Sequence, residues 1–413
     1  MPLIVTLRRL LRHYSEIYTV FLPLFSVFLV LYICILIFSG RHPIAPSPGL
    51  PSPGDSEDTL IYLHRSLVEI PSVTNDEYEV SQFLNRYLTS KGWTVELQSV
   101  SSVPPRNNVF AYRGSSRTTK VLLTSHIDTV PPFIPYSTKD GFLWGRGSVD
   151  AKASVAAQIT AAQDMLASGA IAEEGDISLL FVVGEETDGI GMETANELGL
   201  NLQAAIFGEP TELKLAIGHK GLLIAELAST GKAAHSGYPE LGINANYFLV
   251  EALYRLQHTS YPASSLLGDT TFNAGQIRGG VADNVIPANA SAGLTVRVAA
   301  DLDAVIALMH EAVDAVPHVD LDITLTYDPV LCDYDIPEFD TTVAAYGTDI
   351  PHLRGNHKKY LYGPGSILLA HAENEHIALE DLRDSVVGYK KLVAYSLGYD
   401  IDAVVNTSSQ VRV

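Results

Sequence analysis

The sequence is poor in cysteine and in basic residues. Its 413 residues include only two cysteines, Cys34 and Cys332, which are too few for a disulfide scaffold or a multi-cysteine zinc module. The 27 lysines and arginines face 47 aspartates and glutamates, giving a formal net charge of −20. Because phosphate binding needs a basic surface, this deficit argues against a nucleic-acid-binding protein. The hydrophobic fraction of 47% predicts a globular chain, and its length suggests two domains.

Charge is also missing from one long stretch near the N-terminus. Residues 17–38 contain no charged side chain, and a helix of that length would span about 33 Å, close to the hydrocarbon thickness of a bilayer. Three arginines lie in residues 1–16, so the positive-inside rule predicts a cytoplasmic tail there and a luminal or extracellular body after it. Because the apolar run ends without a good cleavage site, we expect an uncleaved type II signal anchor in the vacuole or secretory pathway. A cleaved leader, and hence a secreted protein, is the alternative.

Residues 39–56 are rich in proline, serine and glycine, a composition typical of an extended stalk. Luminal exposure would fit the two N-glycosylation triplets that begin at Asn289 and Asn406. The leader therefore predicts a membrane-anchored glycoprotein whose folded body begins near residue 57.

From residue 57 the apolar patterns of strands and helices alternate, which predicts an α/β domain with a mostly parallel sheet flanked by helices. The expected helices are Thr59–Ile70, Asn75–Lys91, Ser154–Ser168, Met192–Glu197 and Leu379–Tyr395. The expected strands are Trp93–Leu97, Asn108–Tyr112, Lys120–Thr124, Ile177–Val183 and Ala204–Phe207. Catalytic groups in such a domain are expected at the carboxyl ends of the strands.

The pattern of predicted strands and helices changes within residues 217–327, where the order is β-α-β-β-α-β, as in a ferredoxin-like unit. Its expected elements are Gly221–Ser229, Asn244–His258, Thr271–Ile277, Ala290–Val298, Leu302–Val316 and Asp320–Tyr327. We therefore expect a catalytic domain in two parts, residues 57–216 and 328–413, with this unit inserted between them.

Five segments carry the residue types that bind a divalent cation. They are Ser125-His126-Ile127-Asp128-Thr129-Val130-Pro131, Gly145-Arg146-Gly147-Ser148-Val149-Asp150-Ala151-Lys152, Gly184-Glu185-Glu186-Thr187-Asp188-Gly189, Phe207-Gly208-Glu209-Pro210-Thr211 and Leu368-Leu369-Ala370-His371-Ala372-Glu373-Asn374-Glu375. Three of these segments follow predicted strands, one enters a predicted helix and one is a late loop. An α/β sheet gathers such strand ends on one edge.

Each segment taken singly has an ordinary explanation. His126 could be a surface histidine beside a turn-forming Asp128, Asp150 could be a helix N-cap, and the pair Glu185-Glu186 could be solvated. Together, two histidines and three carboxylates suit two zinc ions that share a bridging carboxylate. One member of the adjacent glutamate pair would then be a ligand and the other a general base, and Asp128 could bond the ring of His126.

These blocks, in this order, resemble the co-catalytic dizinc metallopeptidase family of acetylornithine deacetylase, succinyl-diaminopimelate desuccinylase, carboxypeptidase G and aminoacylase. The resemblance implies Glu185 as general base, Asp128 as the orienter of His126, and Asp150 as the bridge between two zinc ions. The metal ligands that it implies are His126, Asp150, Glu186, Glu209 and His371. Two departures, Ser125 and Ala153, stand where glycine is frequent in the family and involve none of these ligands.

The same resemblance implies that the inserted unit is a lid and dimerisation domain of a homodimer. In Gly231-Lys232-Ala233-Ala234-His235-Ser236-Gly237, His235 matches a histidine that reaches the partner's active site and holds the substrate carbonyl oxygen. Further substrate contacts implied by the family are Asn284, Arg297, Gly365 and Ser366. His235 could instead be a solvated loop histidine, and Arg297 a strand residue in a salt bridge.

The expected function is that of a zinc-dependent metallo-carboxypeptidase that hydrolyses the amide bond next to the free C-terminal carboxylate of small peptides. Glu185 would take a proton from the attacking water and return it to the leaving amine. A deacylase of N-acyl amino acids is the alternative, because both reactions cut an amide beside a carboxylate. A non-catalytic binding protein is a minor alternative, since it would be expected to have lost Glu185 or a ligand.

Two features of this prediction concern the metal and the layout of the chain. Cobalt or manganese could occupy the same ligands as zinc. The anchor, the stalk and the motifs together resemble the fungal vacuolar carboxypeptidase S type.

Overall fold

The computed structural model describes residues 58–172 and 174–407. The predicted cytoplasmic tail (residues 1–16), signal anchor (17–38) and stalk (39–56) lie outside these residues. Among the helices that the structure does describe, none combines the length and the apolar character needed to cross a bilayer.

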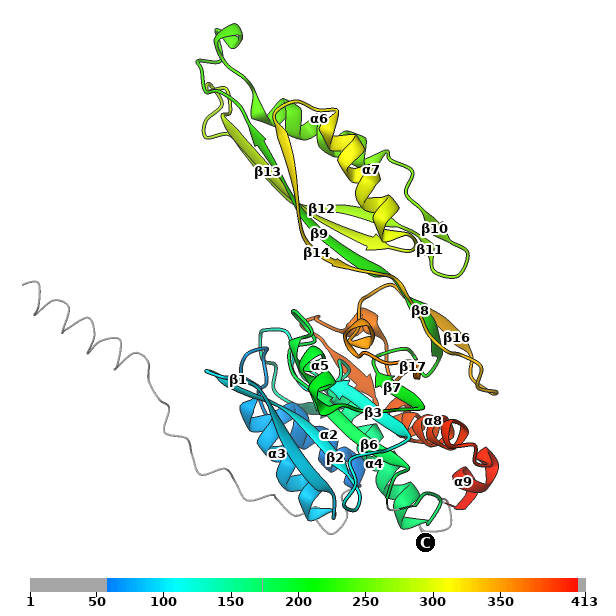
Figure 1. Cartoon of the computed structure of the whole chain (residues 1–413). Helices are drawn as coiled ribbons and strands as arrows, with labels where there is room; N and C mark the ends of the chain where they lie inside the picture. The colour runs from blue at the N-terminus through cyan, green and yellow to red at the C-terminus, as the bar shows by residue number, and fades with distance from the viewer. Residues whose placement is uncertain (1–57, 173, 408–413) are drawn as a thin grey trace, which may run out of the picture. The chain divides into compact units, whose positions relative to one another are not determined.

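A six-stranded, mainly parallel sheet forms the first layer of the fold, with the strand order β1-β2-β6-β3-β7-β17 (Figure 1). The strands are β1 (Thr94–Ser102), β2 (Pro105–Tyr112), β3 (Val121–His126), β6 (Ile177–Val182), β7 (Ala204–Gly208) and β17 (Lys358–Tyr362). The four strands β6, β3, β7 and β17 run parallel, whereas β2 is antiparallel to β6 and β1 to β2. The predicted mainly parallel α/β sheet is therefore present, with an antiparallel hairpin at one edge.

Side chains of β3 alternate between two apolar layers. Val121 and Leu123 pack into the larger core, whereas Leu122 packs on the opposite face. The larger core also contains residues from four helices, namely α2 (Thr59–Glu69), α3 (Tyr78–Ser90), α4 (Lys152–Ala167) and α8 (Leu379–Leu397). The opposite face is covered by α5 (Ile190–Ala195) and by residues around Ile350. A sheet buried on both faces explains the continuous apolar runs of its central strands.

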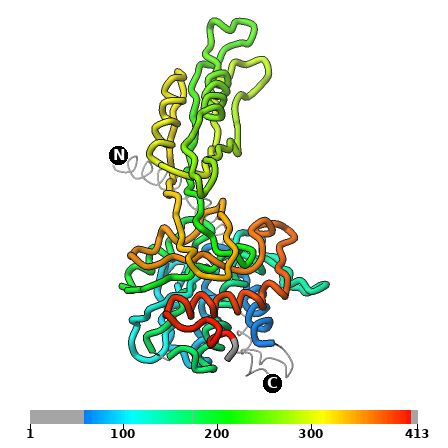
Figure 2. The backbone as a smooth tube through the Cα atoms, turned by 90° about the vertical axis from the view of Figure 1, so that its right-hand side faces the viewer, coloured from blue at the N-terminus to red at the C-terminus, as the bar shows by residue number. Residues whose placement is uncertain are grey.

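Helix α4 is rich in alanine and is buried along most of its length. Its small side chains permit close packing against the sheet, and helices α2 and α8 contribute to the same core. Figure 2 shows the C-terminal helix α8 in red lying across this body. The C-terminal part of the chain thus completes a core that N-terminal residues begin, as the sequence predicts.

One predicted helix begins later than expected. The helix expected from Asn75 starts at Tyr78, because Asn75 has a φ of 81°, which is incompatible with a right-handed helix. The side chain of Glu77, which would suit a first helical turn, instead pairs with Arg106 at 2.6 Å.

A second, four-stranded antiparallel sheet has the order β12-β13-β9-β14. Its elements, in chain order, are β9 (Gly221–Thr230), α6 (Ala245–Gln257), β12 (Thr271–Gly279), β13 (Asn289–Val298), α7 (Leu302–Asp314) and β14 (Val319–Tyr327). This is the predicted β-α-β-β-α-β succession. Helices α6 and α7 lie side by side on one face and enclose a separate apolar core (Figure 2). The domain boundaries and the lid role remain predictions.

The remaining elements are short. One three-stranded sheet consists of β4 (Ser137–Lys139), β5 (Phe142–Trp144) and β18 (His376–Ala378), and another of β8 (Leu215–His219), β15 (Val330–Leu331) and β16 (Thr341–Ala344). A two-stranded hairpin pairs β10 (Ala263–Ser264) with β11 (Gly268–Asp269). Short 3-10 turns occupy Asn196–Leu198, Pro239–Leu241, Ile350–His352 and Ile367–Leu369, and a last helix, α9, spans Ile401–Thr407.

Candidate metal centre and active site

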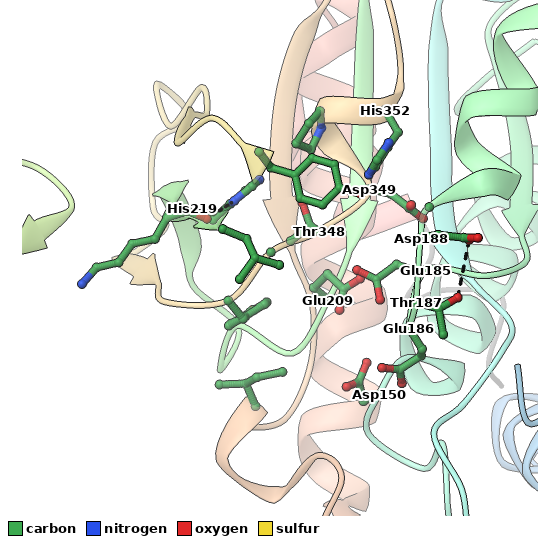
Figure 3. Close-up of a pocket in the computed structure, with 18 of the residues that line it drawn as sticks. Asp150, Glu185, Glu186, Thr187, Asp188, Glu209, His219, Thr348, Asp349 and His352 are labelled. Atoms are coloured by element: carbon green, nitrogen blue, oxygen red, sulfur yellow. Dashed lines mark hydrogen bonds between the residues drawn. The ribbon is translucent and has the colours of Figure 1, made fainter. Parts of the chain in front are cut away.

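The carboxyl ends of three adjacent parallel strands place most of the predicted site residues together. His126 ends β3, the pair Glu185 and Glu186 follows β6, and Glu209 follows β7. Asp150 lies at the entrance of α4 and faces the same edge. Figure 3 shows Asp150 beside Glu186, with Glu185 beside Glu209. This convergence follows from the sheet order, since β3 lies between β6 and β7.

The five predicted ligands form two groups that share Asp150. His126, Asp150 and Glu209 form the first, and Asp150, Glu186 and His371 form the second, with the ligand atoms of each group within 4.8 Å of one another. His126 Nε2 lies 3.1 Å from Oδ1 of Asp150, and His371 Nε2 lies 3.3 Å from Oδ2. Each oxygen of one carboxylate thus faces a different histidine, as a bridging ligand would require.

The alternative explanation of Asp150 as a helix cap does not hold. Ala151 occupies the N-cap position of α4, and the helix has no side-chain cap hydrogen bond. The carboxylate is therefore committed to the two histidines.

The three glutamates lie close together, and the histidines compensate them only in part: His371 Nε2 lies 3.0 Å from Glu186 and His126 Nε2 lies 3.7 Å from Glu209. Burial raises the pKa of Glu185 well above its usual range, and the negative charge of Glu209 is the second largest cause of this rise. Burial likewise raises the pKa of Glu186 and of Glu209. In addition, Oε1 of Glu186 is buried without a hydrogen-bond partner among the described residues. Carboxyl groups gathered in this way suit cations that would favour their ionised forms.

Contacts with carboxylates raise the pKa of both histidines. Asp150 and Glu186 raise the pKa of His371 to about 10. Burial acts to lower the pKa of His126, but the charge of Glu209 and the contacts with Asp128 and Asp150 outweigh it. The donor set of two imidazoles and three carboxylates matches the ligands that zinc takes in proteins.

Asp128 is placed behind this centre. Its carbonyl oxygen lies 3.0 Å from Nδ1 of His126, whereas its carboxylate oxygen lies 3.5 Å away. The expected contact between the aspartate and the ring is thus made more closely by the main chain. The carboxylate instead accepts hydrogen bonds from Thr74 and from the backbone N–H groups of Glu185 and Glu186.

A cavity of about 210 Å³ opens onto the two groups. Its lining includes Asp150, Glu185, Glu186, Glu209 and His371. Of the predicted substrate-binding residues, Arg297 also lines it, and burial lowers the pKa of its guanidinium. The arginine shares the cavity with the carboxylates without forming an ion pair to any described residue, so the salt-bridge explanation gains no support.

The other predicted substrate-binding residues do not line this cavity. His235 and Asn284 lie in adjacent loops, joined by the N–H of Ser236 donating to the carbonyl of Asn284. Gly365 has a φ of 74° and accepts the N–H of Glu212 through its carbonyl, while the Ser366 hydroxyl donates to the carboxylate of Glu212. These two residues hold the loop that follows Glu209. The roles of all predicted site residues remain predictions.

Sequence reasoning missed several residues of the cavity. Asp349 is 4% exposed, burial raises its pKa to about 8, and its Oδ1 has no hydrogen-bond partner among the described residues. Tyr346 and His219 also line the cavity. One available signal was the position of Asp349 shortly after a short strand, Thr341–Ala344, although this strand lacks the continuous apolar run that precedes Glu185 and Glu209.

Comparisons with known proteins agree with this geometry. The sequence profile of "Peptidase family M20/M25/M40" matches residues 122–395. A Peptidase M20 domain-containing protein of Schizosaccharomyces pombe is 51% identical over 343 residues, covering 82% of this chain and 85% of that protein. A probable carboxypeptidase of Aspergillus flavus is 42% identical over 402 residues, covering 86% and 93%.

Two solved structures share the fold. A metallo-carboxypeptidase of the M20 family from Sulfolobus solfataricus superimposes with a TM-score of 0.67 at 15% identity, covering 83% of this chain and all of that one (100%). A dinuclear metal-binding peptidase of the M20 family from Bacillus subtilis gives a TM-score of 0.60 at 16% identity, covering 83% and 98%. The resemblance inferred from the motifs is confirmed, and the chain belongs to peptidase family M20/M25/M40.

Proposed function

We propose that this peptidase is a metallo-carboxypeptidase that removes the C-terminal residue of small peptides with a free carboxylate. The observation that carries the proposal is one cavity lined by Glu185, Arg297 and every member of the two carboxylate–histidine groups except the buried His126. A planar guanidinium is well suited to bind a carboxylate with two parallel hydrogen bonds. The names of the fungal relatives as probable carboxypeptidases support the same substrate class.

We propose two zinc ions as cofactors, with cobalt or manganese as substitutes. His126 and Glu209 would hold one ion, Glu186 and His371 the other, and Asp150 both. The donor set and the clustered carboxyl groups, whose pKa values burial raises, fit such ions. When bound, they would supply a water of lowered pKa and polarise the scissile carbonyl.

The protein's own groups would then carry out the proton transfers and the orientation of the substrate. Glu185 would take a proton from the attacking water and deliver it to the leaving amine. Asp128 fixes the main chain of this glutamate through the N–H group of Glu185. Arg297 would hold the C-terminal carboxylate and thereby orient the scissile amide.

Dimerisation is a second part of this proposal. Helix α6 exposes Tyr247 (74%), Val250 (62%) and Tyr254 (62%) on one side, and an apolar stripe of this kind is typical of an interaction surface. In a homodimer, His235 would be available to the partner's cavity and could hold the substrate carbonyl oxygen. Anchoring of the luminal enzyme through residues 17–38 is proposed from the sequence alone.

A substrate panel tests the proposed activity. The purified enzyme would be incubated with free dipeptides and with N-acetyl amino acids, each with and without a chelator. We expect the enzyme to hydrolyse the dipeptides. The chelator should abolish this hydrolysis, and added zinc should restore it. Preference for the N-acetyl substrates would instead identify a deacylase.

The variant Glu185→Gln separates catalysis from metal binding. It should lose at least about 100-fold in kcat because the general base is removed, while it keeps both metal ions. Full activity in this variant would overturn the assignment of Glu185.

A further inference from the structure

Arg146 and Glu375 form a buried ion pair beside the metal centre. Nη1 of Arg146 lies 2.6 Å from Oε2 of Glu375, and each residue is only 2% exposed. Neither lines the cavity. Because burying two charges costs about as much free energy as their attraction returns, a pair of this kind is weak evidence for stability on its own. The other hydrogen bonds of the two side chains indicate what the pair does.

Glu375 is bonded to the main chain that carries the shared carboxylate. Its Oε1 accepts the N–H of Val149 at 3.2 Å and the N–H of Asp150 at 3.4 Å. The backbone of Asp150 is therefore held independently of the contacts that its side chain makes with the two histidines.

Arg146 is bonded to the loop that carries the second histidine. Nη2 donates to the carbonyl oxygen of His371 at 3.4 Å, and Nη1 also donates to the carbonyl oxygen of Ala372 at 3.2 Å. His371 has a φ of 64°, a conformation that few residues other than glycine adopt. The guanidinium thus supports a backbone conformation that is unfavourable by itself.

Both members of the pair are fixed at their own main chains. The N–H of Arg146 donates to the carbonyl of Ile134 at 3.0 Å, its Nε donates to that of Pro132 at 3.3 Å, and the N–H of Gly145 donates to the carbonyl of Glu375 at 3.2 Å. The pair therefore connects Asp150 and His371, two predicted ligands that lie far apart in the sequence, through a rigid network.

The first ligand group does not depend on this network in the same way. His126 ends β3 and pairs with Val182 of β6, and the N–H of Glu209, directly after β7, donates to the carbonyl of Tyr362 at 3.4 Å. In the second group, His371 lies in an irregular loop and its side chain is 53% exposed. Loss of the ion pair would affect Asp150, which both groups share, but it would affect His371 only in the second group. It should consequently disturb the second group more than the first.

We propose that Arg146 and Glu375 are positioning residues that set the affinity of the Asp150–Glu186–His371 group for its metal ion. This inference rests on the proposed dinuclear function. Mutation of residues that hydrogen-bond to metal ligands typically lowers metal affinity by about 10- to 100-fold. Here the loss of affinity should concern mainly one of the two ions.

The test is a metal titration of the metal-free full chain in competition with a chromophoric chelator, using zinc alone. Wild type is expected to bind two ions. Glu375→Gln keeps an acceptor oxygen for Val149 and Asp150 but loses the charge that pairs with Arg146. In this variant the affinity for one zinc ion should fall by about 10- to 100-fold, whereas the affinity for the other should stay within about threefold of wild type. At saturating zinc its kcat should recover while KM stays unchanged.

Two further variants keep the result interpretable. Arg146→Lys keeps the positive charge but loses the guanidinium hydrogen bonds to the carbonyl oxygens of His371 and Ala372. It should lower the affinity for the same zinc ion. Asp164→Asn removes an ion pair with Lys390, at 2.6 Å between α4 and α8, and should change neither metal affinity. If Glu375→Gln does not fold, Arg146→Lys decides the question.

An equal loss of affinity for both zinc ions, or no change in either affinity, would overturn the proposal. A wild-type chain that binds two ions but hydrolyses no substrate of the panel would contradict the proposed function and leave the titration decisive. A wild-type chain that binds no metal would refute both.

Discussion

The carboxylate of Asp128 accepts the backbone N–H of Glu185 at 3.2 Å. The residue beside His126 thus also fixes the chain segment that carries the predicted general base. Burial opposes ionisation of this carboxylate, but the contact with His126 and the hydrogen bonds from Thr74 and Glu186 lower its pKa. One aspartate therefore links a predicted metal ligand to the predicted base.

Replacing Asp128 with asparagine should impair both functions. The amide oxygen can accept only part of the three hydrogen bonds from Thr74, Glu185 and Glu186, and the NH2 group would face an N–H. We expect zinc affinity and kcat each to fall by about 10- to 100-fold, measured by chelator competition and steady-state kinetics. Thr74→Val, which removes a single donor, should cost less than about fivefold. Wild-type values in Asp128→Asn would contradict this role.

Replacing Arg297 with lysine should reduce recognition of the free carboxylate. Lysine keeps the charge but cannot form the two parallel hydrogen bonds of a guanidinium. We expect kcat/KM for dipeptides to fall by about 10- to 100-fold, mostly through KM, because a charge-assisted pair contributes about 1.5–3 kcal/mol. Arg278→Lys, on an exposed strand position of the same sheet, serves as control. An equal effect of both variants would show that Arg297 has no special contact.

Acid should destabilise the protein through buried histidines. Burial lowers the pKa of His64 from 6.5 to about 4, although Nε2 is bonded to the carbonyl of Ser148 at 2.8 Å. Between these two values the unfolded chain binds more protons, so the free energy of unfolding should decrease as the pH falls from 6.5 toward 4. The loss from this group is roughly 3 kcal/mol.

His64→Gln keeps a donor for Ser148 and should flatten this part of the pH–stability curve, measured by denaturant unfolding at several pH values. The same substitution at the exposed His310 should leave the curve unchanged. A curve of unchanged slope in His64→Gln would show that another group titrates.

The exposed side of helix α6 tests the proposed dimer. Val250→Asp places a charge between Tyr247 and Tyr254, and burying it in an interface is costly. We expect the dimer dissociation constant, measured by analytical ultracentrifugation, to rise at least tenfold while the melting temperature of the monomer changes little. Val387→Asp, at an exposed apolar position on α8, should have no effect. A dimer that survives Val250→Asp uses another surface, and a monomeric wild type refutes the proposal.

The sequence is informative where local patterns decide the structure. Apolar runs located the strands β3, β6 and β7, and their order along one edge follows from general rules for α/β sheets. This is why apolar runs and the residues that follow them are enough to group His126, Glu186 and Glu209. The helix start expected at Asn75 was wrong because periodicity does not report a positive φ.

Other features depend on contacts that no local pattern encodes. Glu375 was visible in the last motif, but its hydrogen bond with Asp150 joins residues 225 positions apart. Likewise, Asp150 contacts a histidine instead of capping a helix because the loop that carries His371 lies close to it in space. Asp349 was overlooked because its significance comes from burial in the cavity.

The two chain connections that enter and leave residues 220–329 run next to each other. His219, the last residue of β8, pairs with Val330 in antiparallel β15, and Leu222 of β9 pairs with Tyr327 of β14. A tight turn between His219 and Val330 would therefore close the chain if the intervening segment were removed. A deletion of this segment would leave the path of the chain through the larger core unchanged.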